Sequence, residues 1–223
     1  MVGVLATGLL VIVLAKGPTW RRDPNRLFRA MYNLVAPIYD LWAGEQSALT
    51  PLRRQLAEMM ELEPGDQVLE VGAGTGANFP FIAAKVGSSG HIYAQDLSEG
   101  MLAQARKKVA TMPCPVDLQQ GQAEDLPYPD NSFDAVLHLG GINFFTDPRR
   151  ALEEMSRVAK PGAKIVVSDE TAPPGTGFGG LVSGAILRLI PRLRPPMHLI
   201  PDPNPQLHYL AGGYIYAIDW RKP

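Results

Sequence analysis

Hydrophobic positions along the middle of the chain follow two alternating patterns. Most of the short apolar runs are followed by a longer segment in which apolar residues recur every three or four positions. The first pattern is typical of buried strands and the second of amphipathic helices. This alternation predicts βαβ units and a mainly parallel sheet with right-handed crossovers. The predicted strands are 67–72, 91–96, 116–120, 133–140 and 163–170, and the predicted helices are 47–61, 76–86, 98–111 and 147–159.

Local signals support two of the helix starts and one turn. Ser98 is a favourable N-cap residue. Asp147 is also a good cap, and Pro148 after it suits the first helical position. Residues 160–163, with the sequence KPGA, are expected to turn the chain into the last parallel strand.

The segments before and after this region are less regular. Residues 26–42 are amphipathic and aromatic, and Pro37 is expected to break a helix there. Residues 177–194 resemble a basic, apolar helix, and residues 208–223 alternate like a final strand. A hairpin-like pair at that edge of the sheet would run antiparallel to the rest.

The amino terminus is uncharged over residues 1–15. A helix of that length spans ~22 Å, against ~30 Å for the bilayer core, and adding residues 16–20 would close the gap. We therefore expect residues 1–20 to form a membrane anchor or an interfacial helix. A buried terminal helix and a cleaved signal remain alternatives. The basic residues that follow predict a membrane-associated domain, residues 21–223, that faces the cytoplasm.

Composition narrows the class of protein. The chain has 223 residues, is 46% hydrophobic and has a net charge of −1, which predicts one ordinary domain and gives no indication of nucleic-acid binding. Cys114 is the only cysteine, so neither a disulfide framework nor a zinc cluster is expected. We expect no metal.

Three glycines, Gly72, Gly74 and Gly76, follow the first predicted strand in the sequence VLEVGAGTGANF. Glycine allows unusual backbone angles and close approach of a ligand, and ligands of open α/β sheets bind beyond the carboxyl ends of strands. The stretch fits the dinucleotide pattern G-x-G-x-x-[GA], and from Glu70 it fits the E-x-G-x-G-x-G pattern of S-adenosylmethionine sites. Asp96, which ends the second strand, would bind ribose hydroxyls in both cases.

Motifs further along the chain distinguish the two patterns. They are VAPIYD (35–40), VLEVGAGTG (68–76), AQDLSEGML (94–102), AEDLPYPDNSFD (123–134), ALEEMSRVAKPGAKIVVSDE (151–170) and LAGGYIYAIDWRKP (210–223). With them the chain resembles class I S-adenosylmethionine-dependent methyltransferases, and more narrowly the ubiquinone/menaquinone C-methyltransferase group. The resemblance covers roughly residues 30–223. It is less specific for the quinone group, because enzymes that methylate phospholipids, sterols and small amines share these motifs.

The resemblance implies an α/β fold of the Rossmann-like, doubly wound kind. Its sheet would be mainly parallel and seven-stranded, with an antiparallel edge strand and helices on both faces. It also implies S-adenosylmethionine as the cofactor. The cofactor-binding residues that it implies are Tyr39, Glu70, Gly72, Ala73, Gly74, Gly76, Asp96, Leu97, Met101, Gln122, Ala123 and His138.

Most of these residues have a specific role in the family. Glu70 and Gly72 would contact the methionine end, and Tyr39 would close over it. Asp96 would bind the ribose, while Leu97 and Met101 would flank the adenine and Ala123 would offer it a backbone N–H.

Two positions carry qualifications. Gln122 replaces the aspartate usual in the family, so its contact with the adenine would be uncharged and weaker. His138 would border the transferred methyl group, but a strand-end histidine serves equally well as a hydrogen-bonded wall residue. No general base is assigned.

The expected function is transfer of a methyl group to a lipophilic acceptor, a prenylated quinol-type ring at a membrane. Residues 1–20 would provide the membrane association. A phospholipid amine or a soluble metabolite remains an alternative acceptor. A protein that binds S-adenosylmethionine without turnover is a further alternative.

Overall fold

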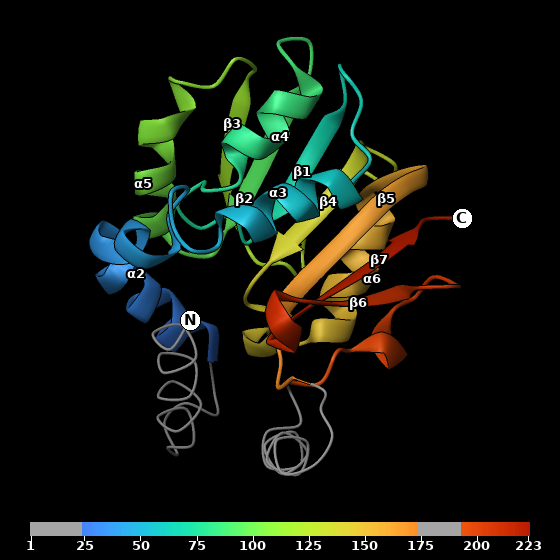
Figure 1. Cartoon of the computed structure of the whole chain (residues 1–223). Helices are drawn as coiled ribbons and strands as arrows, with labels where there is room; N and C mark the ends of the chain where they lie inside the picture. Colours follow the sequence, from blue (N-terminus) through green and yellow to red (C-terminus); the bar gives the residue numbers. More distant parts are fainter. Residues whose placement is uncertain (1–23, 174–192) are drawn as a thin grey trace.

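Seven strands form one sheet in the computed structural model, which describes residues 24–173 and 193–223 (Figure 1). The order across the sheet is β3-β2-β1-β4-β5-β7-β6. The strands are β1 (Gln67–Val71), β2 (His91–Asp96), β3 (Val116–Gln120), β4 (Phe133–Leu139), β5 (Ala159–Glu170), β6 (Gln206–Leu210) and β7 (Ile215–Arg221). Strands β1 to β5 pair in parallel, whereas β7 runs antiparallel to both of its neighbours.

Helices cover both faces of this sheet. They are α2 (Pro24–Ala43), α3 (Thr50–Met59), α4 (Phe79–Val86), α5 (Glu99–Val109) and α6 (Pro148–Val158), with short 3-10 turns η1 (Ile142–Phe144), η3 (Met197–Leu199) and η4 (Ala211–Gly213). The predicted caps are confirmed. The Ser98 side chain accepts from the Met101 N–H at 3.1 Å, and the Asp147 side chain accepts from the Arg150 N–H at 3.0 Å. The seven-stranded, mainly parallel sheet with helices on both faces confirms the predicted fold class.

Two apolar layers hold the helices on the sheet. Side chains of a strand point alternately to its two faces, so Val68 of β1 packs in one layer with α3 and α4, and Leu69 packs in the other with α6. Figure 1 shows α3 and α4 over the first face. The strand order reverses at β1, which lies between β2 and β4. A ligand is expected at the carboxyl ends of strands at this point.

Two local expectations near the carboxyl-terminal half were wrong. Residues 160–163 do not form a separate turn before the strand. Instead, β5 already begins at Ala159, and its register opposite β4 shifts between Phe133 and Ala135. Gly162 lies there at a φ of 80°, and its N–H donates to the Lys222 carbonyl at 2.8 Å, so a bulge replaces the expected turn. Residues 208–223 do not form a single strand, because η4 reverses the chain between β6 and β7. The expected hairpin-like pair at this edge is confirmed, since β6 and β7 pair antiparallel.

Helix α2 runs through Pro37 without the expected break. Polar contacts to the amino-terminal end of α5 hold it in place: the Asn33 amide oxygen accepts from the Ser98 hydroxyl at 2.7 Å and from the Gly100 N–H at 2.8 Å. Near the end of the helix, Asp40 pairs with Lys108 at 2.7 Å. These contacts, with packing on α5, offset the backbone hydrogen bond that proline removes.

The proposed anchor in residues 1–20 lies outside the described residues, as does most of the helix expected over 177–194. Within residues 24–173 and 193–223, no helix has the length and apolar character needed to cross a membrane.

Candidate active site

A cavity of about 850 Å³ lies at the carboxyl ends of β1, β2 and β4, where the strand order reverses. The glycine turn after β1 and helix α2 both contribute walls of this cavity. Ten of the twelve residues predicted to bind the cofactor line this cavity: Tyr39, Gly72, Ala73, Gly74, Asp96, Leu97, Met101, Gln122, Ala123 and His138. The structure therefore brings together residues from four of the quoted motifs, with Gln122 and His138 from outside them. Glu70 and Gly76 are not among the lining residues.

The glycine turn has a backbone that only glycine adopts without strain. Gly72, Gly74 and Gly76 have φ values of 73°, 57° and 74°, a region that other residues enter at a cost. A Cβ at Gly76 would lie 2.4 Å from the Phe79 ring, so this glycine shapes the turn. A Cβ at Gly74 would meet no atom within 4 Å, because that position faces the open cavity.

Gly74 is therefore the position at which backbone strain and ligand contact can be separated. We expect Gly74→Ala to cost about 1–2 kcal/mol of stability, because the residue must stay left-handed. The methyl group would also project into the cavity and should weaken cofactor affinity at least about tenfold, which is ~1.4 kcal/mol.

The control is Gly162→Ala. Gly162 has a φ of 80°, a Cβ added to it would also meet no atom within 4 Å, and it lies in the bulge of β5, outside the cavity lining. Denaturant melts of the two variants should show similar losses, whereas calorimetric titration should show weakened binding only for Gly74→Ala. Equal affinities would contradict a ligand at Gly74.

Asp96 connects the end of β2 to the glycine turn. One carboxylate oxygen accepts from the Gly74 N–H at 2.8 Å, and the other accepts from the Ser98 N–H at 2.8 Å. Each oxygen keeps a lone pair for a further donor, such as a ribose hydroxyl. Burial raises the pKa of Asp96 to about 6, and the two backbone N–H groups oppose this shift.

Glu70 lies behind the glycine turn and belongs to a buried polar network. Its Oε1 accepts from Asn78 Nδ2 at 2.5 Å, and Asn78 Oδ1 accepts from Arg53 Nη1 at 2.6 Å. Arg53 also donates from Nη2 to the Ala43 carbonyl at 2.5 Å, which ties the network to the end of α2. Both Arg53 and Asn78 line the cavity. Sequence reasoning missed these two residues, since only their position in the fold shows that their polar groups are buried.

One oxygen of Glu70 has no hydrogen-bond partner within the part of the chain that the structure describes. This atom, Oε2, is fully buried. Burial raises the pKa of Glu70 to about 7, although Asn78 and Arg53 oppose the shift. A buried carboxylate oxygen without a donor suits a cationic ligand group such as an ammonium. Glu70 does not itself line the cavity, so its contact with the amino-acid end of S-adenosylmethionine stays a prediction, whereas its partners Asn78 and Arg53 do line it.

His138 forms part of the cavity wall at the end of β4. Its Nδ1 donates to the Val71 carbonyl at 2.7 Å, and the ring is fully buried beside Phe145. Burial lowers the pKa of His138, so the imidazole is neutral at physiological pH. A Cβ at Gly72 would lie 3.2 Å from the ring, so the histidine also favours glycine there.

The other end of the cavity is suited to a flat aromatic group. Met101 and Ala123 are buried there, and Leu97 is partly buried. The side chain of Gln122 is exposed, and its amide oxygen accepts from Asn25 Nδ2 at 3.2 Å. A second lone pair on this oxygen is available to an adenine amino group. Contact between these residues and adenine stays a prediction.

The wall that α2 contributes is aromatic and apolar. Phe28, Met31, Val35 and Trp42 line the cavity together with two tyrosines, Tyr32 and Tyr39. Tyr39 packs edge-on against Tyr32 and Trp42, with ring centroids 6.4 and 5.7 Å apart. The predicted residue Tyr39 belongs to this cluster, and its role in covering the methionine end of the cofactor stays a prediction.

Two acidic residues at the end of β5 face the same space. Asp169 and Glu170 both line the cavity. Asp169 accepts from the Gly141 and Asn143 N–H groups, each at 3.1 Å, and so is fixed in position. Burial, together with the neighbouring Asp169 charge, raises the pKa of Glu170 to about 7. Sequence reasoning assigned no role to either residue.

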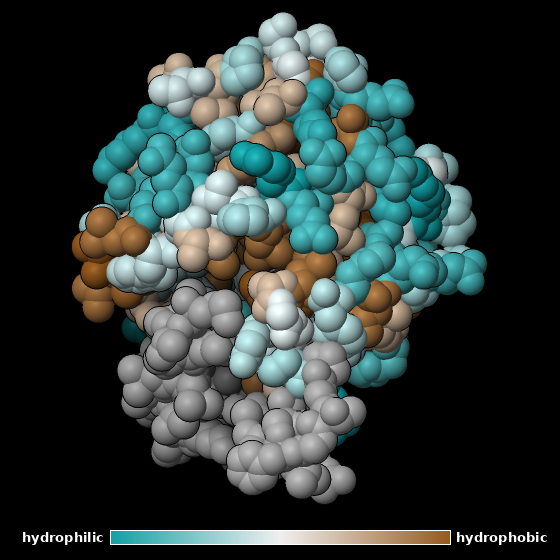
Figure 2. Space-filling model, in the orientation of Figure 1, coloured by the Kyte–Doolittle hydropathy of each residue, from teal (hydrophilic) through white to brown (hydrophobic). Residues whose placement is uncertain are grey.

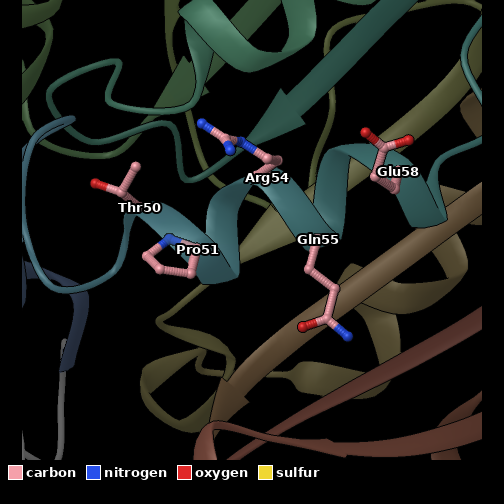
Figure 3. A pocket seen from close by; sticks show the side chains of 5 residues that line it. All are labelled: Thr50, Pro51, Arg54, Gln55 and Glu58. Carbon is pink, nitrogen blue, oxygen red and sulfur yellow. The ribbon is translucent and has the colours of Figure 1, made fainter.

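A smaller hollow of about 420 Å³ lies along α3 (Figure 3). All five residues that line it, Thr50, Pro51, Arg54, Gln55 and Glu58, come from α3 itself. Figure 3 shows Arg54 and Gln55 pointing in different directions, so these side chains do not converge on a ligand. In the described ranges, no group of His, Cys, Asp and Glu residues is arranged to bind a metal ion.

Comparisons with known proteins agree with this geometry. Residues 69–167 match the family model described as "Methyltransferase domain". A demethylmenaquinone methyltransferase of Bacillus mycoides is 37% identical over 127 residues, which are 56% of this chain and 54% of that protein. The protein of the same name from Renibacterium salmoninarum is 34% identical over 167 residues, covering 74% of this chain and 67% of that protein.

A solved structure shows the same fold. The crystal structure of a SAM dependent methyltransferase from Aquifex aeolicus covers 90% of this chain and 99% of its own, with a TM-score of 0.58 and 22% identity. The chain spans between about half and two thirds of the length of the curated relatives with which it aligns first. The match of residues 69–167 and the identity to relatives over most of the chain show its family. The chain belongs to the class I S-adenosylmethionine-dependent methyltransferases, in the group that resembles the ubiquinone and menaquinone C-methyltransferases.

Proposed function

We propose that the protein transfers a methyl group from S-adenosylmethionine to a prenylated quinol-type ring at a membrane. The observation that carries the proposal is the two-sided cavity. One wall is the polar glycine turn with Asp96, and the other is the aromatic face of α2 with Phe28, Tyr32 and Trp42. A cofactor with hydroxyl and amino groups matches the first wall, and a lipophilic ring matches the second. The similarity to demethylmenaquinone methyltransferases supports the same class of acceptor.

The sulfonium of S-adenosylmethionine supplies a methyl group that is already activated. The chain therefore has to align an acceptor with it and keep water away. Proximity and orientation can contribute ~7–11 kcal/mol to such a step. In this proposal Asp96 and the Gly74 backbone fix the donor side, and the α2 wall positions the acceptor ring.

Carbon methylation also releases a proton from the ring or from its hydroxyl group, and a residue must accept it. Glu170 suits this role, because it lines the cavity and its pKa of about 7 lies near physiological pH. His138 suits it less, because its ring is fully buried and Nδ1 already donates to Val71. We propose Glu170 as the proton acceptor.

Its conversion to Gln should lower kcat and remove the rise of kcat with pH near 7, with cofactor affinity unchanged.

Binding of the cofactor should release protons near neutral pH. Before the cofactor binds, the raised pKa of Glu70, about 7, keeps its carboxyl partly protonated. Pairing with the cofactor's ammonium would favour the ionised form and lower that pKa, so the proton leaves on binding. Affinity should therefore rise with pH up to about 7 and level off above it.

Calorimetry in buffers of different ionisation enthalpy measures this release directly. Wild-type protein at pH 7 should release a fraction of a proton per site, and Glu70→Gln should release less. The contribution of Asp96, with a pKa of about 6, should appear at lower pH in both proteins. A binding enthalpy that is the same in all buffers would contradict contact between Glu70 and the cationic end of the ligand.

Incubation with cofactor labelled in its methyl group and a membrane lipid extract tests the acceptor. Label should appear in a quinone fraction, and the mass of the product identifies the methylated compound. Label in phospholipid or in aqueous products would support the alternative acceptors. Calorimetric binding without transfer to any acceptor of a broad panel would instead indicate a binding protein.

A further inference from the structure

Helix α2 presents apolar side chains on two different faces. One face lines the cavity, as described above. The other is exposed to solvent, where Leu34 is 80% exposed, Ile38 51% and Leu41 82%. In the described part of the chain six large hydrophobic residues are exposed, and these three are the most exposed of them. A helix whose only apolar contact is with the cavity would not need a second apolar face exposed to solvent.

The three side chains form one continuous stripe. Positions 34, 38 and 41 are spaced by four and three residues, so they lie on the same side of the helix. Ala30 and Pro37 are also exposed and belong to that side by the same spacing. From residue 30 to residue 41 the stripe extends about 16 Å along the helix axis. Figure 2 shows the apolar patch at the position where Figure 1 places α2.

Polar residues of α2 occupy the flank next to this stripe. Arg29 is exposed there, and Asn33 and Asp40 bind Gly100 and Lys108 of α5 and its amino-terminal end. The polar contacts therefore fix how the helix is rotated about its axis. The aromatic face is turned into the cavity, and the stripe formed by residues 30, 34, 37, 38 and 41 is left outside.

The chain that precedes α2 indicates what covers this stripe. Residues 1–15 are uncharged and largely apolar, and the basic residues Lys16, Arg21, Arg22, Arg26 and Arg29 follow, with Asp23 as the single acid. An apolar helix face beside a basic segment is typical of helices that lie in the interface of an anionic bilayer. Contiguous exposed apolar surface marks a contact with a membrane or with another protein, and the uncharged and basic segments beside the stripe favour the membrane.

We propose that the outer stripe of α2, made of Ala30, Leu34, Pro37, Ile38 and Leu41, rests in the interfacial layer of an anionic lipid bilayer. Helix α2 would then lie between the bilayer on one side and the cavity on the other. A lipophilic acceptor would pass along α2 from the membrane to the face that carries Phe28 and Trp42. This entry route depends on the proposed function, but the membrane contact itself does not.

Depth measurements with a spin label test the contact. Cys114 is buried and can be replaced by alanine, and single cysteines at 34, 38 and 41 then carry a nitroxide. Arg29→Cys, on the polar flank of α2, and Tyr209→Cys, an exposed aromatic position on β6, are the matched controls. The full chain is bound to phosphatidylcholine vesicles that contain phosphatidylglycerol.

At positions 34, 38 and 41 we expect the nitroxide to collide often with oxygen and rarely with a water-soluble nickel complex. At positions 29 and 209 we expect the reverse. Identical values at all five positions would overturn the proposal, even if residues 1–20 anchor the chain. Spin–spin broadening at 34, 38 and 41 would also overturn it, because it would show a second copy of the chain on the stripe. A nitroxide that loses mobility without gaining access to oxygen would also overturn the proposal. It would show that a segment of the same chain covers the stripe.

A substitution test separates the entry route from the chemistry. The triple variant Leu34→Gln, Ile38→Gln and Leu41→Gln should bind S-adenosylmethionine as the wild type does, because none of the three lines the cavity. Methylation of an acceptor embedded in vesicles should fall at least about tenfold, since three buried apolar contacts with lipid are lost. Methylation of a short-chain, water-soluble quinol should not change. Equal losses of methylation activity with both acceptors would contradict the entry route. No activity of the wild type with either acceptor would contradict the proposed function, and the depth measurements would still test the membrane contact.

Discussion

Replacement of Arg53 by methionine is expected to lower the free energy of unfolding by about 3–5 kcal/mol, the usual cost of breaking a buried charge network. Arg53 is 7% exposed, and its guanidinium joins Asn78 to the carbonyl of Ala43. Methionine would fill the volume but leave both acceptors without this donor in a buried place. The network that holds Glu70 behind the glycine turn would lose its positive charge.

The adjacent residue provides the control. Arg54 follows Arg53 on α3 but is exposed, so Arg54→Met should change stability by less than about 0.5 kcal/mol. Urea denaturation of the two variants measures the difference. Because Arg53 lowers the pKa of Glu70, the Arg53→Met variant should also raise that pKa and weaken cofactor binding at neutral pH. Equal stabilities of the two variants would show that the buried network contributes nothing.

The second large effect is expected for Asp96→Ala, which should weaken cofactor affinity by about 2–4 kcal/mol. Two hydrogen bonds from ribose hydroxyls to a charged acceptor contribute about 1.5–3 kcal/mol each, less what water replaces. The carboxylate also positions the N–H groups of Gly74 and Ser98, so its loss loosens the turn at the same time. Calorimetric titration measures the affinity.

Asp117→Ala is the matched control for this change. Asp117 lies on the neighbouring strand β3, but its side chain is 68% exposed and faces His91 rather than the cavity. Its loss should leave affinity unchanged. Asp96→Asn separates charge from geometry, because the amide keeps one acceptor oxygen and should lose less than alanine does. Unchanged affinity in Asp96→Ala would place the ribose elsewhere.

Much of the fold follows from hydrophobic periodicity and capping residues. Strands β2 and β3 have the predicted bounds, and Ser98 and Asp147 begin their helices as expected. These features depend on residues close in sequence. The glycine turn was also recognisable, because alternating glycines after an apolar strand serve little purpose in an ordinary turn.

Features that depend on distant contacts could not be predicted in this way. The bulge at Gly162 forms because its N–H pairs with Lys222, which is sixty residues away in sequence. Helix α2 continues through Pro37 because Asn33 and Asp40 bind α5 and its amino-terminal end. Proline chemistry alone favours a break, and the tertiary contacts override it.

The candidate site shows the same limit. Motifs identified the residues whose backbone or carboxylate faces the ligand, such as Gly74 and Asp96. They gave no indication of Arg53 and Asn78, whose importance comes from burial beside Glu70. Glu170 also needed the structure, because only the fold brings the end of β5 to the cavity.

A crystal structure of the protein with S-adenosylhomocysteine tests the central claim most directly. We predict the adenosine against Leu97 and Met101, the ribose hydroxyls within hydrogen-bond distance of Asp96, and the amino group near Glu70. An empty glycine turn in crystals that contain the bound ligand elsewhere, or a ribose remote from Asp96, would contradict the account.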